Sequence, residues 1–283
     1  MATAIIDGIS TRYEVVGSGP ALLMYAPGGF DATIEKWSTQ GVYAKIKPLN
    51  YLPKHYTCIL FDRRECGQSS GRVERVQWSD FVRHGAGLLD HLKIDRAHLM
   101  GGCMGCPPVA AFGLAHPERV ISMILWWPVG GAKYRLSSHQ RFAEHLAYVH
   151  QNGLQGVVDL VKRDGNVFNA DPRGGPWASV IKHDAAFVEM YLRQDVEKYK
   201  LIVAGMARTL FDRDIAPGPE PEDMLRCEIP ALVVPGNDVA HATSAAWFTH
   251  ECLPKSEFWN APVSGQTEET AGPKLLEFLA RHS

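Results

Sequence analysis

The sequence predicts an α/β fold: a mostly parallel, twisted sheet flanked by helices, with an inserted and mostly helical cap. The first indication is that short apolar runs rich in branched residues alternate with longer helical stretches, up to residue 129 and again from residue 229. Strands separated by helices are typical of a parallel sheet with right-handed crossovers. The second indication is that residues 133–226 carry helical patterns without a clear strand, which predicts the cap.

Length and composition agree with one such domain. The chain has 283 residues, so one α/β domain with an inserted subdomain is the simplest assignment. We assign residues 1–130 and 228–283 to the α/β core and residues 131–227 to the helical cap. The net charge of −2 and the pI of about 6.6 give no sign of a surface for nucleic acid or an anionic membrane. The expected partner is a small-molecule substrate, and a homodimer is left open.

No segment predicts a membrane span or a secreted disulfide framework. The longest apolar run, residues 120–129, has about half of the roughly 20 residues that a spanning helix needs. The N-terminal residues lack a basic start followed by an apolar signal core, so a cytoplasmic protein is expected. Six cysteines in a chain of this size do not indicate a disulfide framework, and their spacing predicts no metal site.

The core elements follow in order from the same patterns. A helix from Ser79, as its N-cap, to His91 has one apolar face, and a second helix covers residues 104–115. Pro273 is expected to open the last helix, because a proline at the first helical position leaves no N–H unpaired. The expected strands are residues 11–16, 21–26, 55–61, 97–100, 120–126, 231–234 and 256–260.

A cysteine between two glycines carries the predicted chemistry. Cys103 follows a short apolar strand, precedes a helix, and lies between Gly101 and Gly105 in a G-x-C-x-G pattern. Small flanking residues let strand and helix pack closely, while the strained turn lifts the side chain out at the carboxyl edge of the sheet. The helix N-terminus favours a thiolate there. We therefore predict that Cys103 is a nucleophile, and a redox dithiol with Cys106 stays open.

With three further segments, the chain resembles the α/β-hydrolase family over almost its whole length. Residues 25–30 resemble the family's oxyanion loop, and residues 61–69 resemble its D-x-R-G-x-G-x-S turn. Residues 234–238 resemble the late strand that delivers the catalytic acid. The resemblance implies a cofactor-independent enzyme in which the backbone N–H groups of Phe30 and Met104 bind the oxyanion and Asp238 is the acid. Members of this family with a cysteine nucleophile include dienelactone hydrolases, whose substrates are activated lactones.

The histidine that this family usually uses as its base is missing. It stands in a G-H pair after the last strand, where this chain has Gln266, and glutamine is not a general base. His241 is the expected replacement, because it follows Asp238 by three residues on a loop at the same sheet edge as Cys103. Three histidines of the cap remain competitors for this role: His139, His145 and His183.

Aromatic residues around the predicted nucleophile indicate an apolar pocket. Trp126 and Trp127 end the strand after the nucleophile helix, and Trp177 belongs to the proposed cap. Together with Gly29 they are expected to line the substrate pocket. Three basic residues of the cap are candidates for binding a carboxylate: Lys133, Arg135 and Arg173.

The predicted function is hydrolysis through an acyl-enzyme on Cys103, with Asp238 and His241 as its partners and without a cofactor. The bond cleaved is that of an ester, a lactone, a thioester or an activated C–C bond in a small aromatic or apolar molecule. A lyase or acyltransferase on the same scaffold is the alternative among enzymes. A binding protein that has lost turnover is the alternative outside them, and the absent G-H pair supports it.

Overall fold

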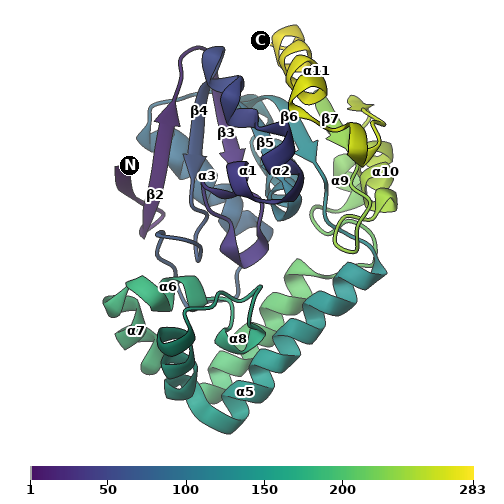
Figure 1. Cartoon of the computed structure of the whole chain (residues 1–283). Helices are drawn as coiled ribbons and strands as arrows, with labels where there is room; N and C mark the ends of the chain where they lie inside the picture. The colour runs from purple at the N-terminus through teal and green to yellow at the C-terminus, as the bar shows by residue number, and fades with distance from the viewer. Residues whose placement is uncertain (1) are drawn as a thin grey trace.

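In the computed structural model, which describes residues 2–283, an eight-stranded sheet runs through the molecule with helices on both faces (Figure 1). The strand order is β1-β2-β4-β3-β5-β6-β7-β8. β2 is antiparallel to both of its neighbours and every other pair is parallel, so the predicted mostly parallel α/β fold is confirmed. The strands are β1 Ala2–Ile6, β2 Ile9–Val16, β3 Ala21–Tyr25, β4 Thr57–Phe61, β5 Ala97–Gly102, β6 Val120–Trp126, β7 Ala231–Val234 and β8 Ser256–Phe258.

Two hydrophobic clusters lie on the two faces of this sheet. Leu22 and Met24 of β3 pack in one cluster with residues of α1, α2 and α11, and Leu23 and Tyr25 pack in the other with residues of α3, α4 and α10. A strand buried on both faces reads as a continuous apolar run, which is why β3 was recognisable in the sequence. The helices of the core are α1 Lys36–Thr39, α2 Gly41–Ile46, α3 Trp78–His91, α4 Cys106–Ala115, α9 Pro221–Met224, α10 Thr243–Cys252 and α11 Glu268–Arg281.

Three details of the predicted elements are wrong. β1 was missed, although Asp7 and Gly8 form the left-handed pair of a tight hairpin, with φ of 49° and 72°. The N-cap of α3 is Gln77 rather than Ser79, in a capping box with the third helical residue. Pro273 does not open α11 but lies inside it, because the helix begins five residues earlier, where Thr267 provides its own capping box.

Four helices between β6 and β7 cover the carboxyl ends of the parallel strands (Figure 1). We call these the cap helices: α5 Ala132–Asp164, α6 Ala178–His183, α7 Ala185–Leu192 and α8 Val196–Leu210. α5 is interrupted at Gly153, where φ is 65°. α9 also lies in the range predicted as cap, but it packs on α4 and α10. No helix within residues 2–283 combines the length and the apolar character that crossing a membrane requires.

The two connections to the cap helices meet at one place. Gly130, just before α5, forms an isolated parallel bridge with His241. Its N–H donates to the carbonyl of Ala240 at 3.0 Å, and the N–H of Gly131 donates to the carbonyl of Ile215, after α8, at 3.0 Å. The loop that follows β7 is therefore hydrogen-bonded to the start of the cap.

Candidate active site

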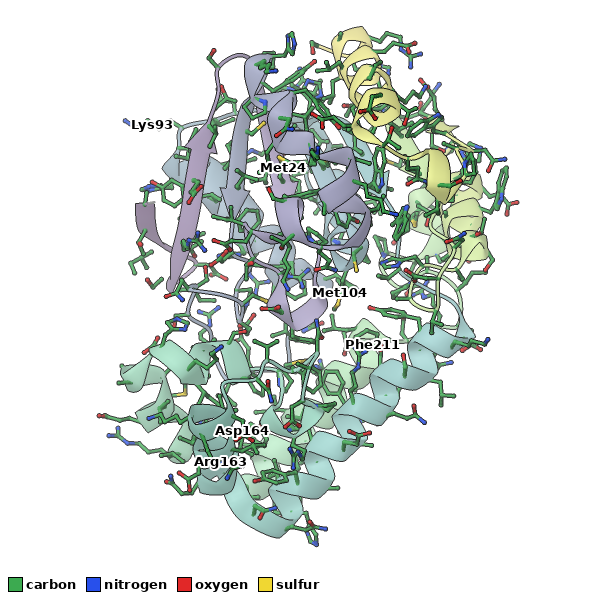
Figure 2. All side chains as sticks on the ribbon, in the orientation of Figure 1. Met24, Lys93, Met104, Arg163, Asp164 and Phe211 are labelled. Atoms are coloured by element: carbon green, nitrogen blue, oxygen red, sulfur yellow. The ribbon has the colours of Figure 1, made fainter. Side chains whose placement is uncertain are left out.

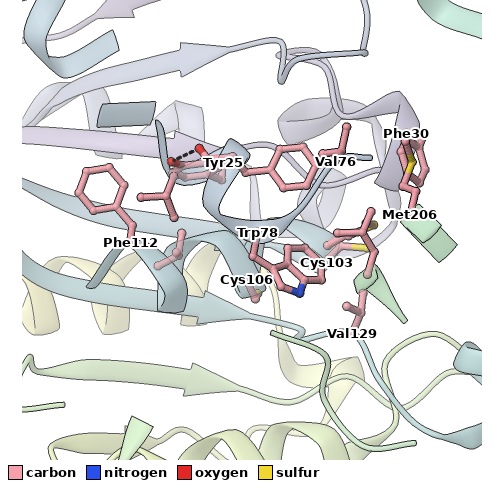
Figure 3. Packing of buried hydrophobic residues seen from close by; sticks show 14 of the residues in the cluster. Tyr25, Phe30, Val76, Trp78, Cys103, Cys106, Phe112, Val129 and Met206 are labelled. Atoms are coloured by element: carbon pink, nitrogen blue, oxygen red, sulfur yellow. Dashed lines mark hydrogen bonds between the residues drawn. The ribbon is translucent and has the colours of Figure 1, made fainter. Parts of the chain in front are cut away.

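Cys103 occupies a strained turn between β5 and α4. Its φ is 55°, the left-handed region that a side chain rarely adopts. A Cβ atom on Gly101 would lie 2.8 Å from the Cys106 nitrogen, and one on Gly105 would overlap the carbonyl oxygen of Tyr25. Both glycines are therefore required for strand and helix to approach this closely. The turn places Cys103 in the same buried cluster as Phe30 (Figure 3).

His241 and Asp238 form a hydrogen-bonded pair on the loop after β7. The Nδ1 of His241 lies 2.8 Å from Oδ1 of Asp238, and the same oxygen accepts the backbone N–H groups of Ala240 and His241 at 2.8 and 2.9 Å. This carboxylate therefore fixes both the loop and the ring. The Nε2 of His241 is buried and has no hydrogen-bond partner among residues 2–283.

Cys103 and His241 perturb each other's titration. Burial alone raises the pKa of the Cys103 thiol, but the charge of the nearby His241, together with the amides of Gly28 and Met104, outweighs it, so that this pKa lies below its ordinary value. Burial lowers the pKa of His241, but Cys103 and Asp238 raise it, to about 10. At neutral pH both shifts favour a thiolate beside an imidazolium. The structure thus brings the three predicted catalytic residues together.

Gln266, at the position where the family usually has its base, has a structural role. Its side chain is fully buried; Oε1 accepts the indole N–H of Trp127 at 2.7 Å, and Nε2 donates to the carbonyls of Pro235 and Ala261 at 2.9 and 3.1 Å. The Trp127 ring in turn packs against His241, with 5.2 Å between ring centroids. Gln266 therefore holds in place the Trp127 ring that packs against the His241 imidazole.

Gln266→Leu is expected to lower the free energy of unfolding by about 1–3 kcal/mol, because it leaves a buried indole N–H and two carbonyls without partners. Urea denaturation measures this change. Gln151→Leu, on an exposed part of α5, is the control and should stay within about 0.5 kcal/mol. Gln266→His should not raise turnover; higher turnover in that variant would mean that position 266 still reaches the reacting groups.

Two loops, one containing Gly28 and Gly29 and the other containing Met104, lie beside the Cys103 sulfur. Arg63 joins them, because its buried guanidinium donates to the carbonyl of Met104 at 3.0 Å and also to the carbonyl of Gly29. Asn169, between α5 and α6, donates to the carbonyl of Gly28 at 2.6 Å. The N–H of Phe30 as an oxyanion donor stays a prediction. Neither Arg63 nor Asn169 was singled out in the sequence, because both contacts are between distant segments.

A cavity of about 190 Å³ lies beside Cys103, between core and cap helices. Met104 from the core and Phe211 from the end of α8 both line it, and Figure 2 labels the two residues. A larger depression of about 860 Å³ opens elsewhere, around Trp78 and Arg96, and contains none of the catalytic candidates. The residues lining the smaller cavity are Gly28, Gly29, Phe30, Gln40, Cys103, Met104, Tyr134, Ser138, Arg141, Phe142, Phe168, Asn169, Phe211, Ala240 and His241.

Of the predicted pocket residues, Gly29 lines this cavity but the three tryptophans do not. Trp126 is fully buried and packs against Trp259 in the cluster on the other side of the sheet. Trp127 supports His241 from behind. Trp177 is buried among the cap helices, where its indole N–H donates to the carbonyl of Arg72 at 2.9 Å. The aromatic lining comes instead from phenylalanines and Tyr134.

The competing residues have other partners. The Nε2 of His139 lies 3.0 Å from the carbonyl oxygen of Phe211. The Nδ1 of His183 lies 2.8 Å from the carbonyl oxygen of Ser179, one turn earlier in the same helix. His145 is buried, its Nε2 lies 2.6 Å from the Tyr199 hydroxyl, and burial lowers its pKa to about 4. None of the three lines the described cavity beside Cys103.

Cys106 does not line the cavity beside Cys103. Its thiol lies 3.2 Å from the carbonyl oxygen of Gly101 and 3.5 Å from that of Trp126. The cysteines of residues 2–283 are all free, and over the same range no three side chains of His, Cys, Asp or Glu are grouped as a metal site would need.

A strained residue on a strand-to-helix turn, at the carboxyl edge of a mostly parallel sheet under helices, defines an α/β hydrolase fold. The chain belongs to this family: the family model described as alpha/beta hydrolase fold matches residues 23–166.

Several curated proteins are similar to parts of the chain. It is 30% identical over 127 residues, 45% of its length, to the dihydrolipoyllysine-residue acetyltransferase component of the acetoin cleaving system from Cupriavidus necator. It is 35% identical over 120 residues, 42% of its length, to 2-hydroxy-6-oxo-6-phenylhexa-2,4-dienoate hydrolase from Comamonas testosteroni. The chain spans 32% and 40% of the lengths of these two relatives.

Solved structures match over the whole chain at low identity. A meta-cleavage product hydrolase from Pseudomonas fluorescens superposes with a TM-score of 0.63 at 17% identity, covering 100% of this chain and 98% of that one. An enol-lactonase from Burkholderia xenovorans gives 0.61 at 18% identity, covering 99% and 100%. These likenesses confirm the fold.

Proposed function

We propose that the protein is a cofactor-independent hydrolase in which Cys103 attacks the carbonyl of an ester, a lactone, a thioester or an activated C–C bond in a small organic molecule. The observation that carries this proposal is the Cys103–His241–Asp238 arrangement at the wall of a cavity. The similarity to a dienoate hydrolase and the fold shared with an enol-lactonase support the same reaction type.

The proposed reaction has two halves. The Cys103 thiolate adds to the carbonyl carbon, and the oxyanion is held by backbone amides of the two loops, including that of Met104. The carbonyl reforms as the bond to the leaving group breaks, and the imidazolium of His241 gives that group its proton. Water then adds to the thioester while neutral His241 takes a proton from it. Breaking the C–S bond releases a carboxylic acid and restores Cys103.

Iodoacetamide is expected to label Cys103 rapidly and selectively near pH 7. The pKa of this thiol is lowered by His241, whereas burial raises the pKa of each of the other five, to about 12 for Cys58 and Cys66. Because thiolate reacts and thiol does not, the labelling rate should fall as pH falls through the lowered pKa. Peptide mapping after alkylation between pH 5 and 9 measures the rate at each cysteine.

His241→Ala removes the positive neighbour, so the same rate profile should move to higher pH. Ester turnover should fall at least about tenfold in this variant, the lower end for loss of general acid–base catalysis. Turnover is followed with 4-nitrophenyl acetate. An unreactive Cys103, with no turnover of esters, lactones or thioesters, would instead identify a binding protein.

A further inference from the structure

One face of α5 presents polar side chains to the cavity. Tyr134, Ser138 and Arg141 follow one another at intervals of four and three residues, which brings them onto the same side of a helix. All three line the cavity that contains Cys103. This helix therefore places a permanent positive charge in the same small space as the nucleophile.

Among the described arginines of the cap helices and their connections, Arg141 is the one that both lacks an ion pair and lines the cavity. It makes no ion pair with any acidic side chain of residues 2–283, and Arg208, which also makes none, is exposed on α8. The remaining arginines of this region each have a carboxylate within 4 Å: Arg135 with Asp214, Arg163 with Asp164, Arg173 with Asp171, Arg193 with Glu189, and Arg213 with Asp212. The two arginines that the sequence suggested for binding a carboxylate are thus already paired.

The cavity offers Arg141 no negative partner of its own. Its described lining contains no aspartate or glutamate, and the Cys103 thiolate is paired with His241. Behind the two loops lies Arg63, buried and likewise without a carboxylate partner in the described chain. Burial and Cys103 raise the pKa of the Tyr134 hydroxyl, whereas Arg63 and Arg141 lower it, so both positive charges act at the cavity wall.

We propose that the substrate hydrolysed at Cys103 carries a carboxylate, and that Arg141 binds it. This inference rests on the proposed function and adds a substrate class to it. A guanidinium offers two parallel N–H donors to a carboxylate, and an arginine that faces an apolar cavity without a partner gains most from such a ligand.

The other walls set the shape of that substrate. Phe30, Phe142 and Phe168 pack edge to face with ring centroids 5.1 to 5.8 Å apart, and Phe211 adjoins them. At about 190 Å³ the cavity is smaller than the roughly 300–1,000 Å³ of sites for drug-sized ligands. It therefore suits a short molecule with a scissile carbonyl at one end, an apolar middle and a carboxylate at the other end.

The test compares two esters of equal chain length, 4-nitrophenyl hydrogen glutarate and 4-nitrophenyl valerate, after subtraction of the uncatalysed rates. The wild type should prefer the glutarate in kcat/KM. Arg141→Met, which keeps the apolar stem, should lower kcat/KM for the glutarate at least about tenfold, mainly through KM, as expected when a charge-assisted hydrogen bond is lost. It should leave the valerate within about threefold. Arg208→Met, the same change at an unpaired arginine outside the cavity, should alter neither.

Two outcomes separate this inference from the proposed function. If the wild type hydrolyses both esters equally and Arg141→Met changes neither, the carboxylate site is overturned while the hydrolase stands. If neither ester is hydrolysed, calorimetric titration of Cys103→Ala with glutarate decides the question. Binding that is lost on adding Arg141→Met would uphold the carboxylate site without the hydrolase, and absence of binding would reject both.

Discussion

Cys103→Ala is expected to reduce hydrolysis of 4-nitrophenyl acetate by about 10³-fold or more and to abolish the acyl-enzyme. Losses of this size follow when a covalent nucleophile is removed from a catalytic group that acts as a unit. In the described lining of the cavity, Cys103 contributes the only thiol. Steady-state turnover measures the loss, and mass spectrometry of the intact protein after mixing with the ester detects the acyl adduct in the wild type alone.

Cys106→Ala is the matched control, since it removes a thiol three residues away on the same helix start. Its sulfur interacts with two backbone carbonyls and does not line the cavity, so most of the turnover should remain. A variant that stays folded and yet loses as much activity as Cys103→Ala would favour a dithiol site over a single nucleophile. Circular dichroism of both variants separates loss of folding from loss of chemistry.

Gly105→Ala is expected to destabilise the fold by roughly 3 kcal/mol or more, because the added methyl group would be overpacked against backbone atoms that cannot move aside on their own. The added methyl group would overlap the carbonyl oxygen of Tyr25 in the central strand β3. Relief requires α4 to move away from the sheet, which would also displace Cys103. Urea or thermal denaturation measures the change, and ester turnover should fall with it.

Gly113→Ala provides the comparison within the same helix. There the added carbon would lie 2.7 Å from the sulfur of Met123, the flexible part of a side chain that can turn aside. Alanine also favours a helix over glycine by about 1 kcal/mol, so the net change should be small. Equal destabilisation by the two substitutions would mean that the close approach at Gly105 is not what holds strand and helix in place.

The parts of the site that were predictable from the sequence are local ones. Gly101, Cys103 and Gly105 lie within five residues, and their pattern alone specifies the turn between a strand and a helix. Asp238 and His241 are close in sequence, so their proximity in space follows from chain length. The roles of these residues in catalysis stay predictions, but the structure places Cys103 and His241 at one cavity, with Asp238 hydrogen-bonded to His241.

The pocket was not predictable, because it depends on where side chains point at the ends of elements. Trp126 and Trp127 are adjacent, yet both pack in the cluster away from the cavity. The reason is that Trp127 has a left-handed backbone with φ of 58°, which breaks the alternation of a regular strand. Arg63 and Asn169 gain their roles only from contacts more than 30 residues away in the chain, for which the sequence holds no local signal.

The bridge between Gly130 and His241 has a mechanical consequence. His241 is bridged to Gly130, which lies just before α5. Gly131, the next residue, is hydrogen-bonded to Ile215 in the connection that leaves α8. If α5 moved away from the sheet, this bridge would therefore also displace the backbone of His241. The position of the His241 imidazole is therefore coupled to the position of the cap helices.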